Sequence, residues 1–72
     1  MKYQKTMLDA DMRTCAMLND LTGEVKFVKC DNEFIAYDFC VSHYHWKEDY
    51  ITYMCDNPTT EPDDVVYTER AV

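Results

Sequence analysis

The chain has 72 residues, of which 47% are hydrophobic and 14% aromatic, and its formal net charge is −7. This length allows a single domain, residues 1–72, and the composition is too rich in core-forming residues for a disordered chain. A domain of this size buries only about 60% of the surface of its unfolded chain, so a metal, disulfides or a partner would add to its stability.

The negative charge is concentrated in the second part of the chain. Residues 1–30 carry four acids and five bases, whereas residues 31–72 carry ten acids and only two bases, Lys47 and Arg70. Such a surface repels nucleic acid and anionic membranes and attracts basic proteins. We therefore expect no direct binding to nucleic acid, and a basic protein as partner, such as a nucleic-acid-binding enzyme or complex.

No signal peptide and no transmembrane segment are predicted. The start, MKYQKTMLDADM, lacks an apolar run of about seven residues, and no stretch approaches about 18 apolar residues. We expect a cytoplasmic protein without membrane contact. Its four cysteines are then expected as free thiols or metal ligands rather than in disulfides.

The N-terminal segment is compatible with two structures. Thr6 and Asp9 resemble a capping box at a helix start, but Asp9-Ala10-Asp11 also has the composition of a turn between strands. A strand is preferred, and the choice between helix and strand for residues 6–20 stays open.

A β-meander is predicted over residues 12–41. Its first strand is segment 12–18, a turn follows at residues 20–23, and the second strand is the β-branched and aromatic segment 25–30. After a second polar turn, the third strand is predicted over residues 34–41. One face of this third strand is expected in the core: Ile35, Tyr37, Phe39 and Val41.

Residues 42–55 also fit either a helix or a strand. Ser42 can cap a helix, whereas Tyr50–Tyr53 has strand composition and favours a strand over residues 49–55. The acidic segment 56–65 contains two prolines and is predicted to be a loop outside the core. The predicted fold class is therefore α+β and β-rich, a small antiparallel sheet with at most one short helix; an all-β fold is the alternative.

A zinc site is one interpretation of the cysteine-rich middle of the chain. Cys40 and His43 have the spacing of half a site, and Cys30, His45 or Cys55 would complete a tetrahedral set. A second compact pair of ligands is missing, so we expect no metal and no other cofactor. The cysteines are interpreted as small buried hydrophobic residues, with the histidines at a rim.

No catalytic site is expected. Cys40, His43 and Asp49 can be combined into a cysteine, histidine and acid set, but many short sequences allow this, and a chain of this length has little volume for a cleft. The nucleotide-binding motifs GxxxxGK[ST] and GxGxxG and the protease motif HExxH do not occur. A non-enzymatic protein is predicted.

Aromatic and acidic residues between positions 46 and 64 form the candidate partner-binding site. The rings are too bulky to be wholly internal in so small a domain, and tyrosine and tryptophan often anchor interfaces. Alternatively, the rings form the core and the acids only keep the protein soluble. The predicted site consists of Trp46, Glu48, Asp49, Tyr50, Tyr53, Asp56, Glu61, Asp63 and Asp64.

In length and charge, over the whole chain, the sequence resembles the small acidic inhibitors that bacteriophages encode, the anti-CRISPR and anti-restriction proteins. The resemblance implies a nucleic-acid mimic in the host cell cytoplasm: carboxylates placed where phosphates would lie occupy a basic groove, and aromatic rings slow dissociation. It includes no family motif and assigns no residue. A small zinc-binding structural module and an accessory subunit of a larger complex are the alternatives.

Overall fold

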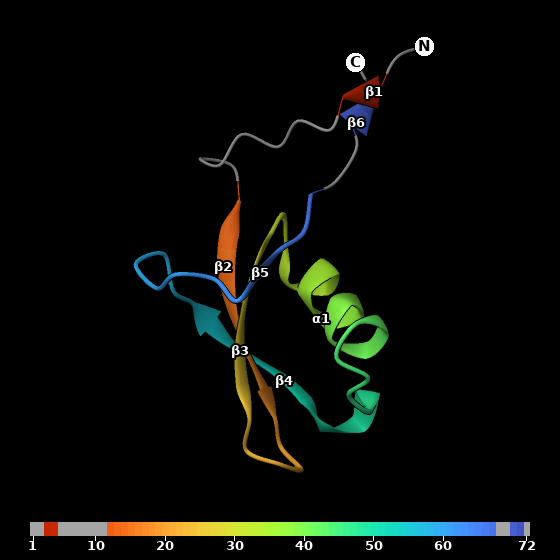
Figure 1. Ribbon diagram of the computed structural model, residues 1–72, viewed down its shortest axis with the longest axis vertical. Helices are drawn as coiled ribbons and strands as arrows, with labels where there is room; N and C mark the ends of the chain where they lie inside the picture. Colours follow the sequence, from red (N-terminus) through yellow and green to blue (C-terminus); the bar gives the residue numbers. More distant parts are fainter. Residues whose placement is uncertain (1–2, 5–11, 68–69, 72) are drawn as a thin grey trace.

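The computed structural model describes residues 3–4, 12–67 and 70–71. A four-stranded mixed sheet carries one α-helix on one face (Figure 1). The elements of this unit are β2 (Arg13–Asn19), β3 (Val25–Cys30), α1 (Glu33–Ser42), the short 3-10 helix η2 (Glu48–Tyr50), β4 (Ile51–Asp56) and β5 (Asp64–Val65). Two further short strands, β1 (Tyr3–Gln4) and β6 (Arg70–Ala71), pair antiparallel with each other. The predicted α+β, β-rich class is confirmed.

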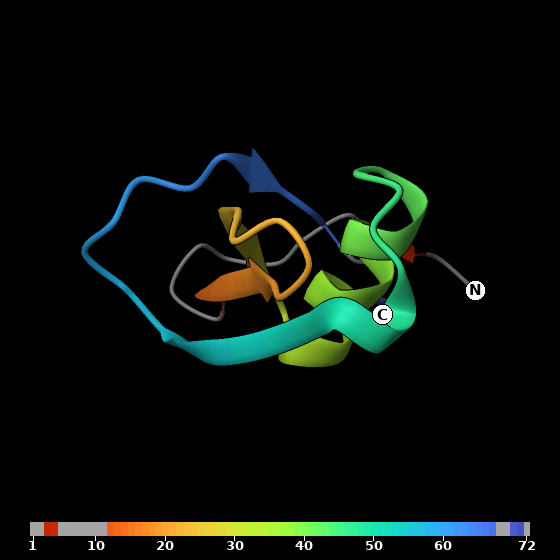
Figure 2. The same cartoon turned by 90° about the horizontal axis from the view of Figure 1, so that it is seen from below.

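The strands of the sheet are arranged in the order β4, β2, β3, β5. Because β2 is antiparallel to both β3 and β4, these two strands run parallel to each other, and α1 is the crossover between them. Residues 57–63 then cross back from β4 to β5 on the face opposite α1 (Figure 2). The two crossovers run in opposite directions across opposite faces of the sheet. Both therefore have the same hand.

The core lies between α1 and the sheet. Cys15 and Met17 alternate along β2, and Ala36 and Cys40 are about one turn apart on α1, so each pair lies on a single face of its element. Three cysteines serve as small core residues, as predicted, whereas Cys55 is exposed. The buried cluster consists of Cys15, Met17, Val28, Cys30, Ala36, Cys40 and Trp46.

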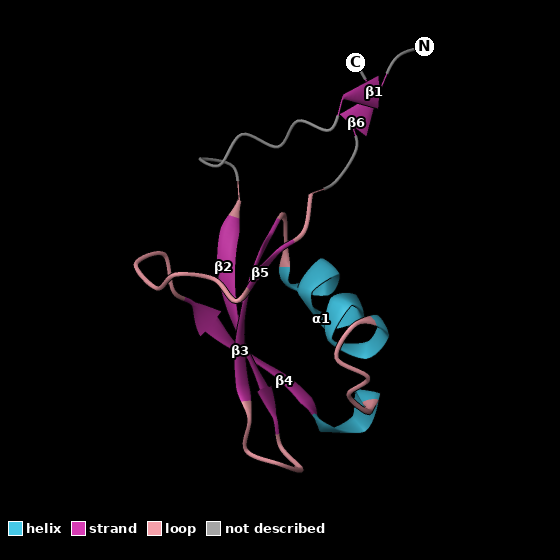
Figure 3. Cartoon of the chain, in the orientation of Figure 1, coloured by secondary structure: helices cyan, strands magenta, loops and turns pink. Residues whose placement is uncertain are grey.

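Three of the predicted strands are confirmed. Segments 12–18 and 25–30 correspond to β2 and β3, and the strand predicted over 49–55 is β4, which begins two residues later. Two details are wrong. The third strand of the meander, over residues 34–41, is helix α1 (Figure 3), and the sheet is mixed because β5 pairs parallel to β3.

Helix α1 begins at an asparagine cap. The side-chain oxygen of Asn32 accepts hydrogen bonds from the main-chain N–H groups of Phe34 (2.9 Å) and Ile35 (3.0 Å), which otherwise lack partners within the helix. Ala36 and Cys40, which the predicted strand would turn away from the core, are the buried residues of this helix. Helical periodicity, not strand alternation, therefore decides which side chains are buried here.

The remaining predictions concern the N-terminal segment and the ability of a helix to cross a membrane. Of residues 6–20, for which helix and strand were both possible, residues 13–19 are extended and residues 6–11 lie outside the described residues. Within the described part of the chain, no helix is long and apolar enough to cross a membrane.

Candidate partner-binding surface

The turn after α1 brings Trp46 into the core. The N–H of His43 donates to the carbonyl of Phe39 (2.8 Å) and ends the helix, and His45 then takes a φ of 61°, a left-handed conformation that histidine adopts more readily than most residues. The N–H of Trp46 donates to the carbonyl of Cys40 (3.1 Å). Since Trp46 is only 7% exposed, it packs in the core and is not part of the surface proposed below.

Four of the predicted site residues follow directly in η2 and β4. Glu48 and Asp49 are exposed on η2, and Tyr50 and Tyr53 are 38% and 37% exposed. The hydroxyl of Tyr37 on α1 donates to the carbonyl of Glu48 (3.1 Å), which attaches η2 to the helix. These acids and rings are thus presented by an anchored segment.

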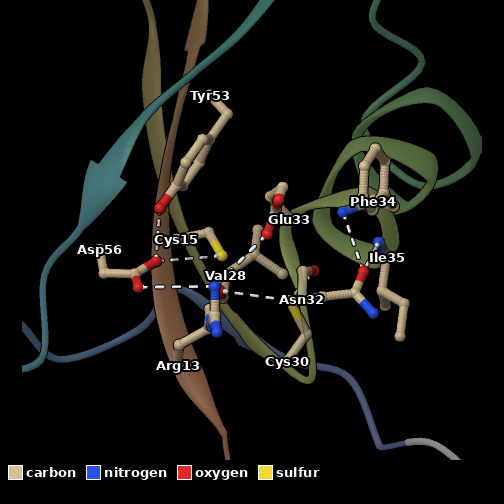
Figure 4. A network of polar contacts seen from close by, with 10 residues as sticks. All are labelled: Arg13, Cys15, Val28, Cys30, Asn32, Glu33, Phe34, Ile35, Tyr53 and Asp56. Atoms are coloured by element: carbon tan, nitrogen blue, oxygen red, sulfur yellow. Dashed lines mark hydrogen bonds and ion pairs between the residues drawn. The ribbon is translucent and has the colours of Figure 1, made fainter.

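Asp56 connects the end of β4 to β2 (Figure 4). Its carboxylate accepts a hydrogen bond from the Tyr53 hydroxyl (2.6 Å), lies 3.7 Å from the Arg13 guanidinium and is 3.9 Å from the Cys15 thiol. Arg13 also lies 3.4 Å from Glu33, at the start of α1. The bond to Asp56 raises the pKa of Tyr53 to about 12, so this phenol stays neutral and its ring is held beside the carboxylate.

The three predicted loop acids have different surroundings. Glu61 is exposed. The N–H of Asp63 donates to the carbonyl of Phe27 (2.7 Å), and its carboxylate accepts from the N–H of Phe27 (2.8 Å). Asp64 accepts a hydrogen bond from the hydroxyl of Tyr44, whose pKa is raised by burial and by this bond. The loop predicted to lie outside the core therefore includes two acids with tertiary contacts. Asp63 attaches it to β3, and Asp64 attaches it to the turn that follows α1.

The structure separates the predicted site into two groups. Glu61, Asp63 and Asp64 lie in or beside the segment that leads to β5, at the opposite edge of the sheet from β4. With two strands between them, the two edge strands are about 14 Å apart at a strand spacing of about 4.8 Å. We call the other group the β4 surface: Glu48, Asp49, Tyr50, Tyr53 and Asp56.

Two residues that lie beside the β4 surface were not among the predicted site residues. The carboxylate of Asp20 accepts a hydrogen bond from the Thr52 hydroxyl (2.7 Å), and Met54 is 51% exposed. Met54 is the extra residue of a β-bulge, because Met17 pairs with Tyr53 while the adjacent residue of β2 pairs with Cys55. Both features depend on the register between β2 and β4, for which a single sequence has no signal.

The residues considered for zinc are divided between the core and the surface. Cys30 and Cys40 are buried, whereas His43, His45 and Cys55 are exposed. Burial raises the pKa of Cys40 to about 11, so its thiol is neutral at physiological pH. Across the described residues, no three histidine, cysteine, aspartate or glutamate side chains are grouped so that they could hold a metal ion.

A pocket of about 310 Å³ lies near the start of the crossing segment. Two of its charged residues, Arg13 and Asp56, lie 3.7 Å apart and offset one another. We assign no ligand to it. The pocket is lined by Met12, Arg13, Thr14, Lys29, Asp56 and Pro58.

Comparisons with protein-family models, with curated proteins and with solved structures found no match. No residue role is transferred from a relative, and the functional proposal depends on the chemistry of the surface itself.

Proposed function

We propose that this protein is a non-enzymatic acidic binding protein that inhibits a basic, nucleic-acid-binding protein by occupying its surface. The observation that carries the proposal is the β4 surface, where three exposed carboxylates and two partly exposed tyrosine rings lie within nine consecutive residues. Carboxylates present to lysine and arginine the charge that phosphates would present, and tyrosine rings add contact area at a low entropic cost.

The charge distribution supports this class of partner. Ten acids and two bases in residues 31–72 favour encounter with a cationic surface and oppose contact with phosphates. In the proposal the protein acts in the cytoplasm, of the host cell if a phage encodes it, in the manner of the anti-CRISPR and anti-restriction inhibitors that it resembles in size and charge.

The test is displacement of nucleic acid from a captured partner. The tagged full chain is used to isolate partners from host cells, and each purified partner is bound to a fluorescent oligonucleotide whose anisotropy is followed. We expect the protein to release the oligonucleotide, less effectively at higher salt, and not to retard the bare oligonucleotide in a gel. A partner that keeps its oligonucleotide at saturating protein, or tight binding of bare oligonucleotide, would contradict the proposal.

A matched pair of variants tests the β4 surface. Glu48→Gln with Asp49→Asn removes two charges from it, and Glu24→Gln with Asp38→Asn removes two exposed charges elsewhere. At about 0.5 to 1 kcal/mol for each exposed contact, the two substitutions together cost about 1 to 2 kcal/mol, so the first variant should need about five- to thirtyfold more protein for displacement. The second should stay within about twofold of the natural sequence. Equal effects would show that only net charge matters.

A further inference from the structure

Strand β4 is an edge of the sheet. In the strand order it has β2 on one side, and among the described residues no strand pairs with its other side (Figures 1 and 2). Ile51 is half-buried and the next five residues are exposed. The outer main-chain groups of such a strand are available to another extended chain.

Strand β4 has few of the features that usually prevent an edge strand from pairing with another chain. Edges are commonly protected by lysine, by proline, by a bulge or by being very short. The other edge, β5, has only two residues. β4 has six, ITYMCD, without lysine or proline, and its bulge at Met54 leaves Ile51–Tyr53 in regular register with β2. β4 is therefore the edge long enough to accept a further strand.

Carboxylates surround this edge. Glu48 and Asp49 precede the strand, Asp56 is its last residue, and Asp20 contacts its Thr52 through the 2.7 Å hydrogen bond. An incoming strand would place its side chains beside these groups, at the distance of cross-strand pairs, where opposite charges stabilise and like charges destabilise.

The same acids disfavour a second copy of this chain. If two β4 strands paired antiparallel about Thr52 and Tyr53, Asp56 of one copy would be in register with Asp49 of the other. Two cations close in sequence or space do not reverse this balance, since Arg13 is already paired with Asp56 at 3.7 Å and Lys47, which precedes η2, is a single charge. The edge thus excludes its own copy and suits a basic strand.

We infer that β4 accepts an extended, lysine- or arginine-rich segment of the partner as a fifth strand of the sheet. Main-chain hydrogen bonds along the outer side of β4 hold the segment, the carboxylates pair with its cations, and Tyr53 and Met54 contact its apolar side chains. This inference rests on the proposed function and defines how the basic partner is bound.

The test uses the full chain, labelled with ¹⁵N, and three short peptides. The first alternates lysine with valine, the second is the same peptide with N-methylated main-chain amides, and the third has glutamate in place of lysine. We expect the lysine peptide to shift the amide signals of residues 52–56 and to slow their hydrogen exchange. Methylation keeps the charges but removes the donors, so it should weaken binding at least about tenfold, and the glutamate peptide should not bind.

The outcomes separate this inference from the proposed function. Equal binding of the lysine peptide and its methylated twin would overturn strand pairing and leave acidic binding in place. No binding of the lysine peptide, or protection of residues 52–56 by self-association without peptide, would also overturn it, whereas the displacement assay tests inhibition independently. The variant Glu48→Gln with Asp49→Asn should bind the lysine peptide more weakly than Glu24→Gln with Asp38→Asn does.

Discussion

Replacing Asp63 with alanine should lower the free energy of unfolding by about 1 to 1.5 kcal/mol. Its carboxylate accepts the N–H of Phe27 at 2.8 Å, and a hydrogen bond to a charged group contributes about 1.5 to 3 kcal/mol, but this bond is exposed, which weakens it. The value should therefore lie at or below the lower end of that range. Asp63→Asn keeps an acceptor oxygen and should restore more than half of the loss.

The assay is urea unfolding followed by the fluorescence of Trp46. With a slope of about 1 kcal/mol per molar urea for a small domain, Asp63→Ala should move the midpoint down by about 1 M or more. Glu61→Ala is the matched control, because it removes the same charge from the same segment and no described residue hydrogen-bonds to Glu61. If Asp63→Ala and Glu61→Ala unfold at the same midpoint, the bond between the crossing segment and β3 does not stabilise the fold.

Three other predictions concern the core and the helix. A thiol reagent should label Cys55 quickly in the folded protein and the other three cysteines only in denaturant, since those are 0% exposed; fast labelling of a second thiol would contradict this core. Above pH 9 the thermal midpoint should fall. Unfolded thiols ionise near pH 9, whereas burial raises the pKa of Cys15 to about 12 and that of Cys40 to about 11. The unfolded chain therefore binds fewer protons above pH 9, and each thiol lowers the free energy of unfolding by up to about 1.4 kcal/mol per pH unit. Cys40→Ala should make the fall of the thermal midpoint with pH less steep, and an unchanged slope would argue against this role of the Cys40 thiol. Asn32→Ala should reduce the free energy of unfolding by about 1 kcal/mol and Asn32→Ser by much less, measured with urea.

The three longer strands could be predicted because their residues carry local signals, whereas helix α1 could not. Segment 34–41 is rich in phenylalanine, tyrosine, isoleucine and valine, residues that favour strands. The opposing signal was Asn32 followed by Glu33, a cap and a first-turn acid. The decisive constraint is topological, since β3 and β4 run parallel on either side of β2 and need a crossover.

The residue types of the candidate surface could be predicted, but not their positions. Tyr50 and Tyr53 are partly exposed while Trp46 is buried, and this division depends on how the turn after α1 meets the sheet. The roles of Asp63 and Asp64 depend on contacts with Phe27 and Tyr44, at separations of 36 and 20 residues. A local sequence pattern has no information on such contacts, which require the assembled sheet.

The position of β2 in the middle of the sheet has a consequence for the order of folding. Its pairing with β3 joins residues as close as Leu18 and Val25, whereas its pairing with β4 joins Cys15 to Asp56. Closing the longer loop costs more entropy and is slower, so the β2–β3 hairpin should form first and β4 should pair with β2 later. During synthesis one side of β2 then stays unpaired until residues 51–56 have left the ribosome. The outer edge of β4 forms only when β4 pairs with β2, so a chain in which only the hairpin has folded lacks the edge that we propose for the partner.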